Sequence, residues 1–252
     1  LSVLGALLRE PGLRGAELAL CDLNADGLES IRRLAERANR DWEAGWRITA
    51  GTNRADLLPG ADFVVLSIAI DREACWRSDF DIARRHGITH YAENGGPAAL
   101  FHAARNIEVI LPILRDIEFY CPEAWLLNFT NPMVRICTAA RRYSKVKTLG
   151  ICHQIGFGHM MLGVLLGDAI GVDVPPGYRF VWQPEALREE KRIAAEVAAK
   201  VDVVAAGTNH CTWMLSIRER GTGRDLYPLL WERIDTHEPG FEPLTRDVAR
   251  TF

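Results

Sequence analysis

Two hydrophobic patterns alternate along this 252-residue chain up to residue 151. Short, continuous apolar runs such as 61–70 are typical of parallel strands that are covered on both faces. Between these runs, apolar residues recur every three or four positions, which is the spacing of an amphipathic helix. The pattern predicts strands at 16–23, 46–49, 61–70, 124–129 and 146–151, and helices at 1–10, after an Asn24 cap, and at 72–86, 98–120 and 132–143. The repeated strand–helix order predicts an α/β fold with a doubly wound parallel sheet.

The pattern changes after His153. Two helices at 156–167 and 184–200 are followed by strands at 201–206 and 213–219 and by a short helix at 225–234. We therefore predict two domains, 1–152 with the parallel sheet and 153–252 with an α+β arrangement. A dinucleotide-binding sheet normally begins with a strand and a Gly-rich turn, and neither precedes the helix at 1–10. The first domain is thus predicted to lack its first strand and Gly-rich loop.

Composition limits the class of protein. With 48% apolar and 25% charged residues, the chain suits a globular protein with a sizeable core. A net charge of -3 gives no basic surface for nucleic acid, so no nucleic-acid partner is predicted. No apolar run reaches the roughly 18–20 residues that span a bilayer, so no membrane partner is predicted. Six scattered cysteines favour free thiols in a reducing compartment, and we predict a cytoplasmic protein.

Polar residues follow the apolar strands at the point where each strand ends. In open α/β sheets, ligands bind beyond the carboxyl ends of the strands. Asp22 in that position could accept the ribose hydroxyls of a dinucleotide, or could simply open the turn before Asn24. Asn128 and Asn131 end another strand, although Asn before Pro is also a common turn opener.

Cys152 and His210 also lie at strand ends and could converge in space. One thiolate and one imidazole leave several coordination positions open, as a catalytic metal that binds substrate requires. The alternatives are an inert core thiol and a structural histidine. Glu93 lies in a Gly-Gly-Pro loop that could approach a ligand or be solvated. Arg77 could pair with a ligand oxygen or face water on its helix.

Four segments in this order closely resemble glycoside hydrolase family 4, the NAD- and manganese-dependent glycosidases. They are YAENGGPAALFHAARNI, AWLLNFTNPM, KTLGICHQIG and AAGTNHCTWM. The resemblance runs from about Leu1 to about Leu230. It implies a Rossmann fold related to lactate and malate dehydrogenases, NAD and Mn²⁺ as cofactors, and catalytic, substrate and oligomerisation functions in 153–252. Glycoside hydrolases of this family are exceptions to the usual pair of carboxylates.

The resemblance also implies a role for each matching residue. Cys152 and His210 match the metal ligands, and Asn131 matches the asparagine that contacts the sugar beside the nicotinamide. Asn128 and Asn131, at the end of one strand, are both implied to bind the cofactor. Asp22 matches the residue that holds the adenosine ribose. Two further positions correspond to substrate contacts in the family: Glu93 to an acidic loop residue and Arg77 to an arginine. His153 stands where members acting on 6-phosphorylated sugars carry Asp, which implies the α-galactosidase, α-glucosidase and α-glucuronidase-like branch.

The chemistry implied by the resemblance starts with NAD taking a hydride from C3 of the sugar. The C2 proton then becomes acidic and is removed, the C1 substituent leaves with His153 as acid, and water and the hydride are returned. The metal polarises the C2 and C3 oxygens. The substrate would be an unphosphorylated α-glycoside or a glycuronide.

Two departures from the family predict a chain truncated at both ends: the absent Gly-rich loop, and a catalytic tyrosine expected beyond Phe252. This leaves open whether the chain by itself turns over. One alternative is a lactate/malate-type NAD-dependent dehydrogenase, and another is a non-catalytic sugar-binding fragment. A homodimer or homotetramer is expected from the family.

Overall fold

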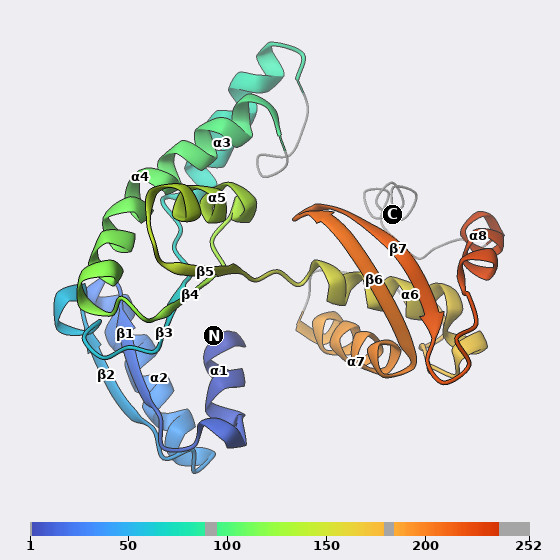
Figure 1. Ribbon diagram of the computed structural model, residues 1–252, viewed down its shortest axis with the longest axis horizontal. Helices are drawn as coiled ribbons and strands as arrows, with labels where there is room; N and C mark the ends of the chain where they lie inside the picture. Colours follow the sequence, from blue (N-terminus) through green and yellow to red (C-terminus); the bar gives the residue numbers. More distant parts are fainter. Residues whose placement is uncertain (1, 89–94, 179–183, 237–252) are drawn as a thin grey trace. The chain divides into compact units, whose positions relative to one another are not determined.

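The computed structural model describes residues 2–88, 95–178 and 184–236. The chain forms two compact units, 1–150 and 151–252. In the first unit, at least one helix or 3-10 turn separates each strand from the next, and α3 and α4 both lie between β3 and β4 (Figure 1). Its helices are α1 (Ser2–Arg9), α2 (Ala25–Asp41), α3 (Arg72–Arg85), α4 (Gly96–Tyr120) and α5 (Met133–Tyr143), with short 3-10 turns η1 (Pro11–Leu13) and η2 (Arg54–Asp56).

The five strands described in the first unit pair in parallel. β1 (Glu17–Cys21) pairs with β2 (Arg47–Gly51), and a second sheet has the order β3 (Phe63–Leu66), β4 (Trp125–Asn128), β5 (Lys147–Gly150). A doubly wound sheet has the strand order 3-2-1-4-5-6. The β1-β2 and β3-β4-β5 pairings match the neighbours 2-3 and 4-5-6 of that order, and no strand among the described residues pairs with both sheets. The predicted α/β class and parallel pairing are confirmed.

Helices α4 and α5 cover one face of the β3-β4-β5 sheet. Ile110, Leu114 and Ile117 of α4 pack with Leu126 of β4 and Ile136 of α5, and all five are almost completely buried. This packing explains the apolar stripe of α4, which continues through Pro112 without a break.

The opposite face of this sheet differs from the sequence-based expectation. Phe63 on β3 is 64% exposed, and Val65, Trp125 and Leu149 are also exposed. The expectation that the run 61–70 is covered on both faces is therefore wrong for the described residues, because the helices that bury β3 lie on one side. The strand itself is also shorter, since it spans only Phe63–Leu66.

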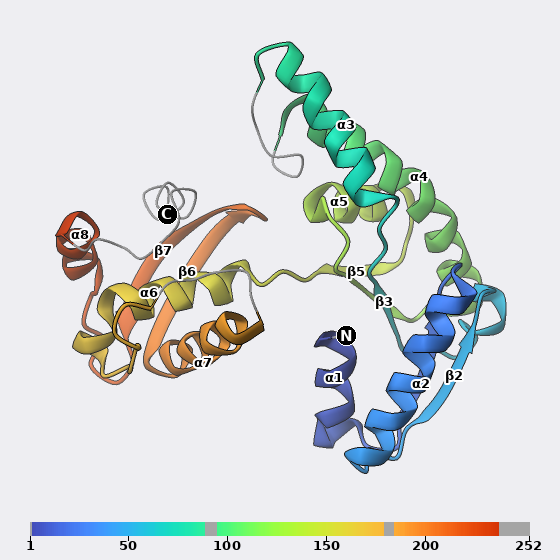
Figure 2. The same ribbon diagram turned by 180° about the vertical axis from the view of Figure 1, so that it is seen from behind.

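The described residues of the second unit form an antiparallel hairpin and three helices. β6 (Val201–Thr208) pairs with β7 (Cys211–Glu219), and α6 (Gln154–Ile170), α7 (Pro184–Lys200) and α8 (Tyr227–Thr236) complete it (Figure 2). A Cβ atom on Gly163 would lie 2.4 Å from Ile193, so glycine allows α6 and α7 to approach closely.

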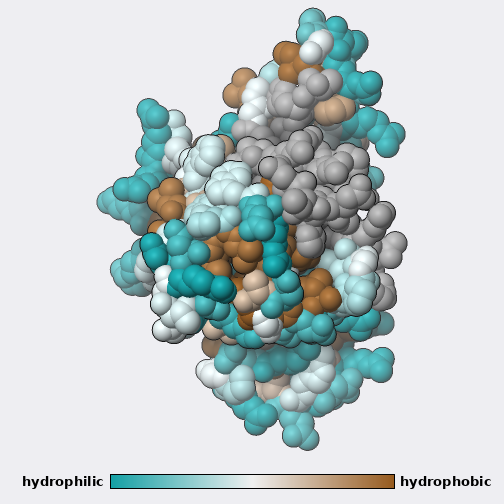
Figure 3. Space-filling view, turned by 90° about the vertical axis from the view of Figure 1, so that its right-hand side faces the viewer, coloured by the Kyte–Doolittle hydropathy of each residue, from teal (hydrophilic) through white to brown (hydrophobic). Residues whose placement is uncertain are grey.

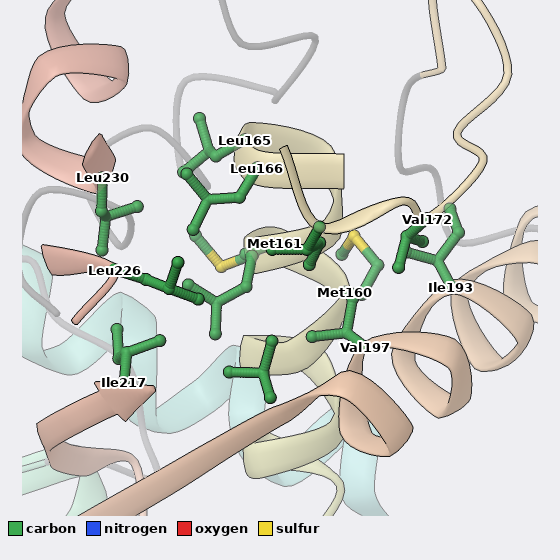
Figure 4. Close-up of a cluster of buried hydrophobic side chains, with 13 residues drawn as sticks. Met160, Met161, Leu165, Leu166, Val172, Ile193, Val197, Ile217, Leu226 and Leu230 are labelled. Atoms are coloured by element: carbon green, nitrogen blue, oxygen red, sulfur yellow. The ribbon is translucent and has the colours of Figure 1, made fainter. Parts of the chain in front are cut away.

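A single cluster of apolar side chains holds the second unit together. Met160 of α6 lies near Ile193 and Val197 of α7 (Figure 4), in a cluster of buried residues that also includes Leu166 of α6 and Ile217 of β7. One face of the hairpin is therefore buried against apolar side chains of α6 and α7.

Some apolar side chains of the second unit remain exposed. Val204, Trp213 and Leu215 of the hairpin and Trp231 of α8 are each more than half exposed. Figure 3, which faces the side on which α8 lies in Figure 1, shows hydrophobic residues gathered among hydrophilic ones. None of the described helices is long and apolar enough to cross a membrane.

Candidate active site

The side chains of Cys152 and His210 meet in the second unit. Cys152 lies between β5 and α6, and His210 lies in the two-residue turn between β6 and β7. The Cys152 sulfur and the His210 Nε2 atom are 3.6 Å apart, although 58 positions separate the residues in sequence. The predicted convergence in space is thus observed. That the pair binds a metal stays a prediction.

The turn that carries His210 has an unusual backbone. His210 has a φ of 64°, in the left-handed region that few residues other than glycine adopt. Gly207 has a φ of 141°, and a Cβ atom there would lie 2.4 Å from the carbonyl oxygen of Cys211. A strained residue that persists in a folded protein is held by its surroundings and is frequent at functional sites.

Gln154, in the first turn of α6, connects the two sides of this site. Its Oε1 atom accepts a hydrogen bond of 2.8 Å from the backbone N–H of His210. The same oxygen lies 3.2 Å from the hydroxyl of Thr212 and 3.5 Å from the Nδ2 atom of Asn209. Sequence reasoning missed this residue, although it directly follows Cys152 and His153 in a segment that carried the family resemblance.

The surroundings of Cys152 favour its thiolate form. Burial by itself raises the pKa of this thiol, but hydrogen bonds from His210, Asn209 and the backbone of Gln154 outweigh it, and the pKa lies below the ordinary value of 9.0. A thiolate is the form of cysteine that ligates metals and acts as a nucleophile. Two other cysteines offer a contrast, because burial raises the pKa of Cys121 and Cys137.

The Cys152 sulfur and the His210 Nε2 atom, 3.6 Å apart, are close enough that one metal ion would be held by both. Among the described residues, no group of three or more His, Cys, Asp or Glu side chains gathers to hold a metal. Cys152 and His210 are therefore a pair of candidate ligands, and no third such side chain joins them among the described residues.

His153 is exposed at the N-cap of α6, beside Cys152. Glu190 of α7 is only 7% exposed, and burial raises its pKa, while the charges of His153 and Lys191 oppose the rise. A buried carboxyl thus lies within electrostatic reach of the imidazole that sequence reasoning proposed as an acid. Its burial is invisible in sequence, because Glu190 stands in a charged helix.

In the first unit, Asn128 and Asn131 end β4 and the turn that follows it. The Asn128 side chain is fully buried, donates to the Thr130 carbonyl and accepts from the Thr130 N–H, both at 3.0 Å. These bonds hold the turn that carries Asn131. The Asn131 carbonyl accepts a 3.2 Å bond from Asn106 of α4, a second residue that sequence reasoning missed. The cofactor and sugar roles of Asn128 and Asn131 stay predictions.

The three remaining candidates also lie in the first unit. Asp22 is exposed at the end of β1 and accepts a 2.9 Å bond from the N–H of Asn24, so it does open a turn, as in its alternative interpretation. Arg77 is exposed on α3. Glu93 lies outside the described residues. No contact described for these residues tests their proposed ligand roles.

A Rossmann-type α/β unit, followed by a smaller unit in which a cysteine side chain lies beside an imidazole, defines the class of protein. Residues 1–166 match the Family 4 glycosyl hydrolases, and the chain belongs to this family. The chain is 32% identical to an α-glucosidase of Erwinia rhapontici over 89% of its own length and 44% of that relative. It is 30% identical to an α-galactosidase of Bacillus subtilis over 92% of its length and 47% of that relative. The chain therefore spans about half the length of these relatives.

Solved structures show the same fold. A putative glucosidase of Bacillus subtilis superposes with a TM-score of 0.75 at 24% identity, over 93% of this chain and 48% of that one. A 6-phospho-α-glucosidase from gut microorganisms, solved with NAD and Mn²⁺, gives 0.72 at 21% identity over 92% and 46%. A malate dehydrogenase of Plasmodium falciparum gives 0.60 at 13% identity over 92% and 59%. The predicted relation of the fold to dehydrogenases is confirmed.

Proposed function

We propose that this chain is part of a glycosidase that hydrolyses an unphosphorylated α-glycoside or a glycuronide with the help of NAD and Mn²⁺. The observation that carries the proposal is the 3.6 Å separation of the Cys152 sulfur and the His210 Nε2 atom. Family membership supports the reaction class, and related structures contain both cofactors. A cytoplasmic homo-oligomer is part of the same proposal.

Each candidate residue has a place in this reaction. Cys152 and His210 would hold the metal, and the thiol is prepared for this because its pKa is lowered. When bound, NAD would supply a hydride acceptor for C3 of the sugar, and the metal would polarise the C2 and C3 oxygens. His153 would donate a proton to the glycosidic oxygen as it leaves C1.

The first unit would hold the cofactor and part of the sugar. Asp22 would accept the ribose hydroxyls, and Asn131 would contact the sugar beside the nicotinamide. Asn128 supports this by fixing the turn that carries Asn131. Arg77 and Glu93 are proposed as further contacts with sugar oxygens. The domain roles follow: 1–152 would bind the dinucleotide, and 153–252 would supply catalytic, substrate and oligomerisation functions.

The substrate branch rests on His153 and on the nature of the relatives. An imidazole directly after Cys152 takes the place of the Asp that members acting on phosphorylated sugars carry. Several relatives are named α-glucosidase, α-galactosidase and α-galacturonidase. We therefore place the substrate among neutral or uronic α-glycosides.

The test uses the protein expressed from its complete gene. Aryl α-glucosides, α-galactosides and α-galacturonides should be cleaved only when NAD and Mn²⁺ are both present, under reducing conditions. Cleavage that persists after dialysis against EDTA without added NAD would refute the mechanism. NAD-dependent oxidation of a hydroxy acid without glycoside cleavage would instead support a lactate/malate-type dehydrogenase. Sugar binding without turnover would support the non-catalytic interpretation.

A further inference from the structure

Gln154 lies next to both proposed metal ligands and has been given no role so far. Cys152 precedes α6, whereas His210 belongs to the β6-β7 hairpin, so the two ligands come from separate elements. Their separation depends on how the hairpin turn is fixed to the start of the helix. Gln154 stands two residues after Cys152 at the start of α6, while its side chain accepts from the N–H of His210. One residue thus contacts both sides of the site.

We propose that Gln154 is a positioning residue, whose side-chain oxygen fixes the His210 turn against the Cys152 sulfur and so forms the pair before any metal binds. The proposal rests on the proposed function for the identity of the ligand. The positioning itself is a statement about the metal-free protein.

The chemistry of the side chain fits this role. A carboxamide oxygen has two lone pairs and can serve more than one donor. Here the main donor is the backbone N–H of His210, at 2.8 Å, with the Thr212 hydroxyl and the Asn209 amide farther away. The Thr212 hydroxyl also lies 3.1 Å from the Thr208 carbonyl, so its single proton is shared between two acceptors. The bond to His210 is therefore the one that matters most.

The turn needs such an anchor. His210 holds a left-handed backbone conformation that costs free energy for a residue with a side chain. A hydrogen bond to its N–H offsets part of that cost and fixes the direction in which the imidazole leaves the turn. Partners that orient metal ligands in this way are worth about 10- to 100-fold in metal affinity when removed.

The test compares Gln154→Met with Gln154→Glu. Methionine keeps the length of the side chain and its helix propensity but removes the oxygen, whereas glutamate keeps an acceptor for the His210 N–H. Ile155→Met is the matched control, because it places the same residue one position later, where the side chain is 38% exposed. Far-ultraviolet circular dichroism checks that each variant is folded.

Two readouts separate positioning from metal binding. In metal-free protein, amide hydrogen exchange at His210 should become at least about 10-fold faster in Gln154→Met, and should change less than about threefold in Gln154→Glu and Ile155→Met. Titration with Mn²⁺, followed by the paramagnetic resonance of the free ion, should show about 10- to 100-fold weaker binding only in Gln154→Met.

The outcomes distinguish the two proposals. If the unmodified chain binds no Mn²⁺ but His210 exchange responds as expected, the positioning role stands and the metal assignment fails. If Mn²⁺ binds and Gln154→Met changes neither exchange nor affinity, the positioning role is overturned and the metal assignment stands. A loss in Gln154→Glu as large as in Gln154→Met would also overturn it, because the acceptor oxygen would then be irrelevant.

Discussion

Asn106 on α4 donates a 3.2 Å hydrogen bond through its side-chain nitrogen to the backbone carbonyl of Asn131. The same nitrogen lies 2.9 Å from the carbonyl of His102 and 3.2 Å from that residue's Nδ1 atom. Asn106 is only 3% exposed. A buried amide therefore connects the longest helix of the first unit to the turn that carries a proposed sugar contact.

Replacing Asn106 with leucine should destabilise the chain. The change keeps the approximate volume but leaves the Asn131 carbonyl without this donor, which costs about 1–3 kcal/mol when the group is buried. Urea unfolding measures the effect. Glu108→Leu, an exposed position on the same helix, is the control and should stay within about 0.5 kcal/mol of the unmodified chain. Equal effects of both substitutions would contradict the role of the hydrogen bond.

Much of the first unit could be predicted from sequence, because unbroken apolar runs and helical spacing are strong local signals. The extent of β3 could not, since the apolar run 61–70 continues past Leu66 into a turn, where the N–H of Ile68 bonds to the Thr130 hydroxyl. The exposure of Phe63 was also missed. A run without alternation does not reveal that helices cover only one face of a sheet.

The candidate site could also be predicted only in part, because sequence reveals local features but not tertiary contacts. Cys152 and His210 could be predicted as candidates because each follows a predicted strand. In the structure, the hairpin turn places His210 beside Cys152. Gln154 accepts a hydrogen bond from the backbone N–H of His210, and Asn106 donates one to the backbone carbonyl of Asn131. Nothing in their sequence neighbourhood indicates those partners, because the partners are set by tertiary structure.

Gly207→Ala should disrupt the hairpin that carries His210. The new Cβ atom would lie 2.4 Å from the Cys211 carbonyl oxygen, and the φ of 141° is unfavourable for alanine. We expect about 2–4 kcal/mol of destabilisation, since strain and a backbone clash act together. Gly221→Ala is the matched control, because its φ of 82° carries strain but no heavy atom lies within 4 Å. It should cost only about 1–2 kcal/mol. Thermal unfolding of both variants gives the comparison, and equal losses would argue against the close contact.

Glu190→Gln should stabilise the second unit at neutral pH. Burial raises the pKa of Glu190 in the folded chain above its unfolded value, near 4.5. The free energy of unfolding therefore falls as the pH rises from about 4.5 through the folded pKa, because the carboxyl then has to lose its proton while buried. Glutamine avoids this loss. The melting temperature of the variant should exceed that of the unmodified chain at pH 7.5, and the gap should close toward pH 4.

Glu189, which precedes Glu190, provides a control for which the expected change in stability at pH 7.5 has the opposite sign. Arg192 hydrogen-bonds to Glu189 at 2.9 Å and lowers the pKa of that carboxyl. Its contribution is present above about pH 4.5 and is lost as the pH falls through the lowered pKa, so Glu189→Gln should slightly destabilise the chain at pH 7.5. A Glu190→Gln variant that loses stability in the same way would show that Glu190 is a paired carboxylate.

Alkylation of Cys152 should depend on His210. The thiol has a lowered pKa despite its burial, because His210 and Asn209 hydrogen-bond to it. In His210→Ala the effect of burial is less opposed, so the midpoint of the pH dependence of iodoacetamide labelling should move to higher pH. Mass spectrometry of the Cys152 peptide measures the rate, with the buried Cys121 as an internal reference whose thiol pKa is raised by burial. An unchanged midpoint would contradict the pairing.

The central claim is that Cys152 and His210 bind one metal ion together. Titration of the chain with Co²⁺ under reducing conditions tests it most directly, because a bound thiolate gives a sulfur-to-metal charge-transfer band in the ultraviolet. The account predicts this band in the unmodified chain with one ion per chain, its absence in Cys152→Ser, and at least about 10-fold weaker binding in His210→Ala. No band in the unmodified chain, or a band of unchanged affinity in His210→Ala, would contradict the account.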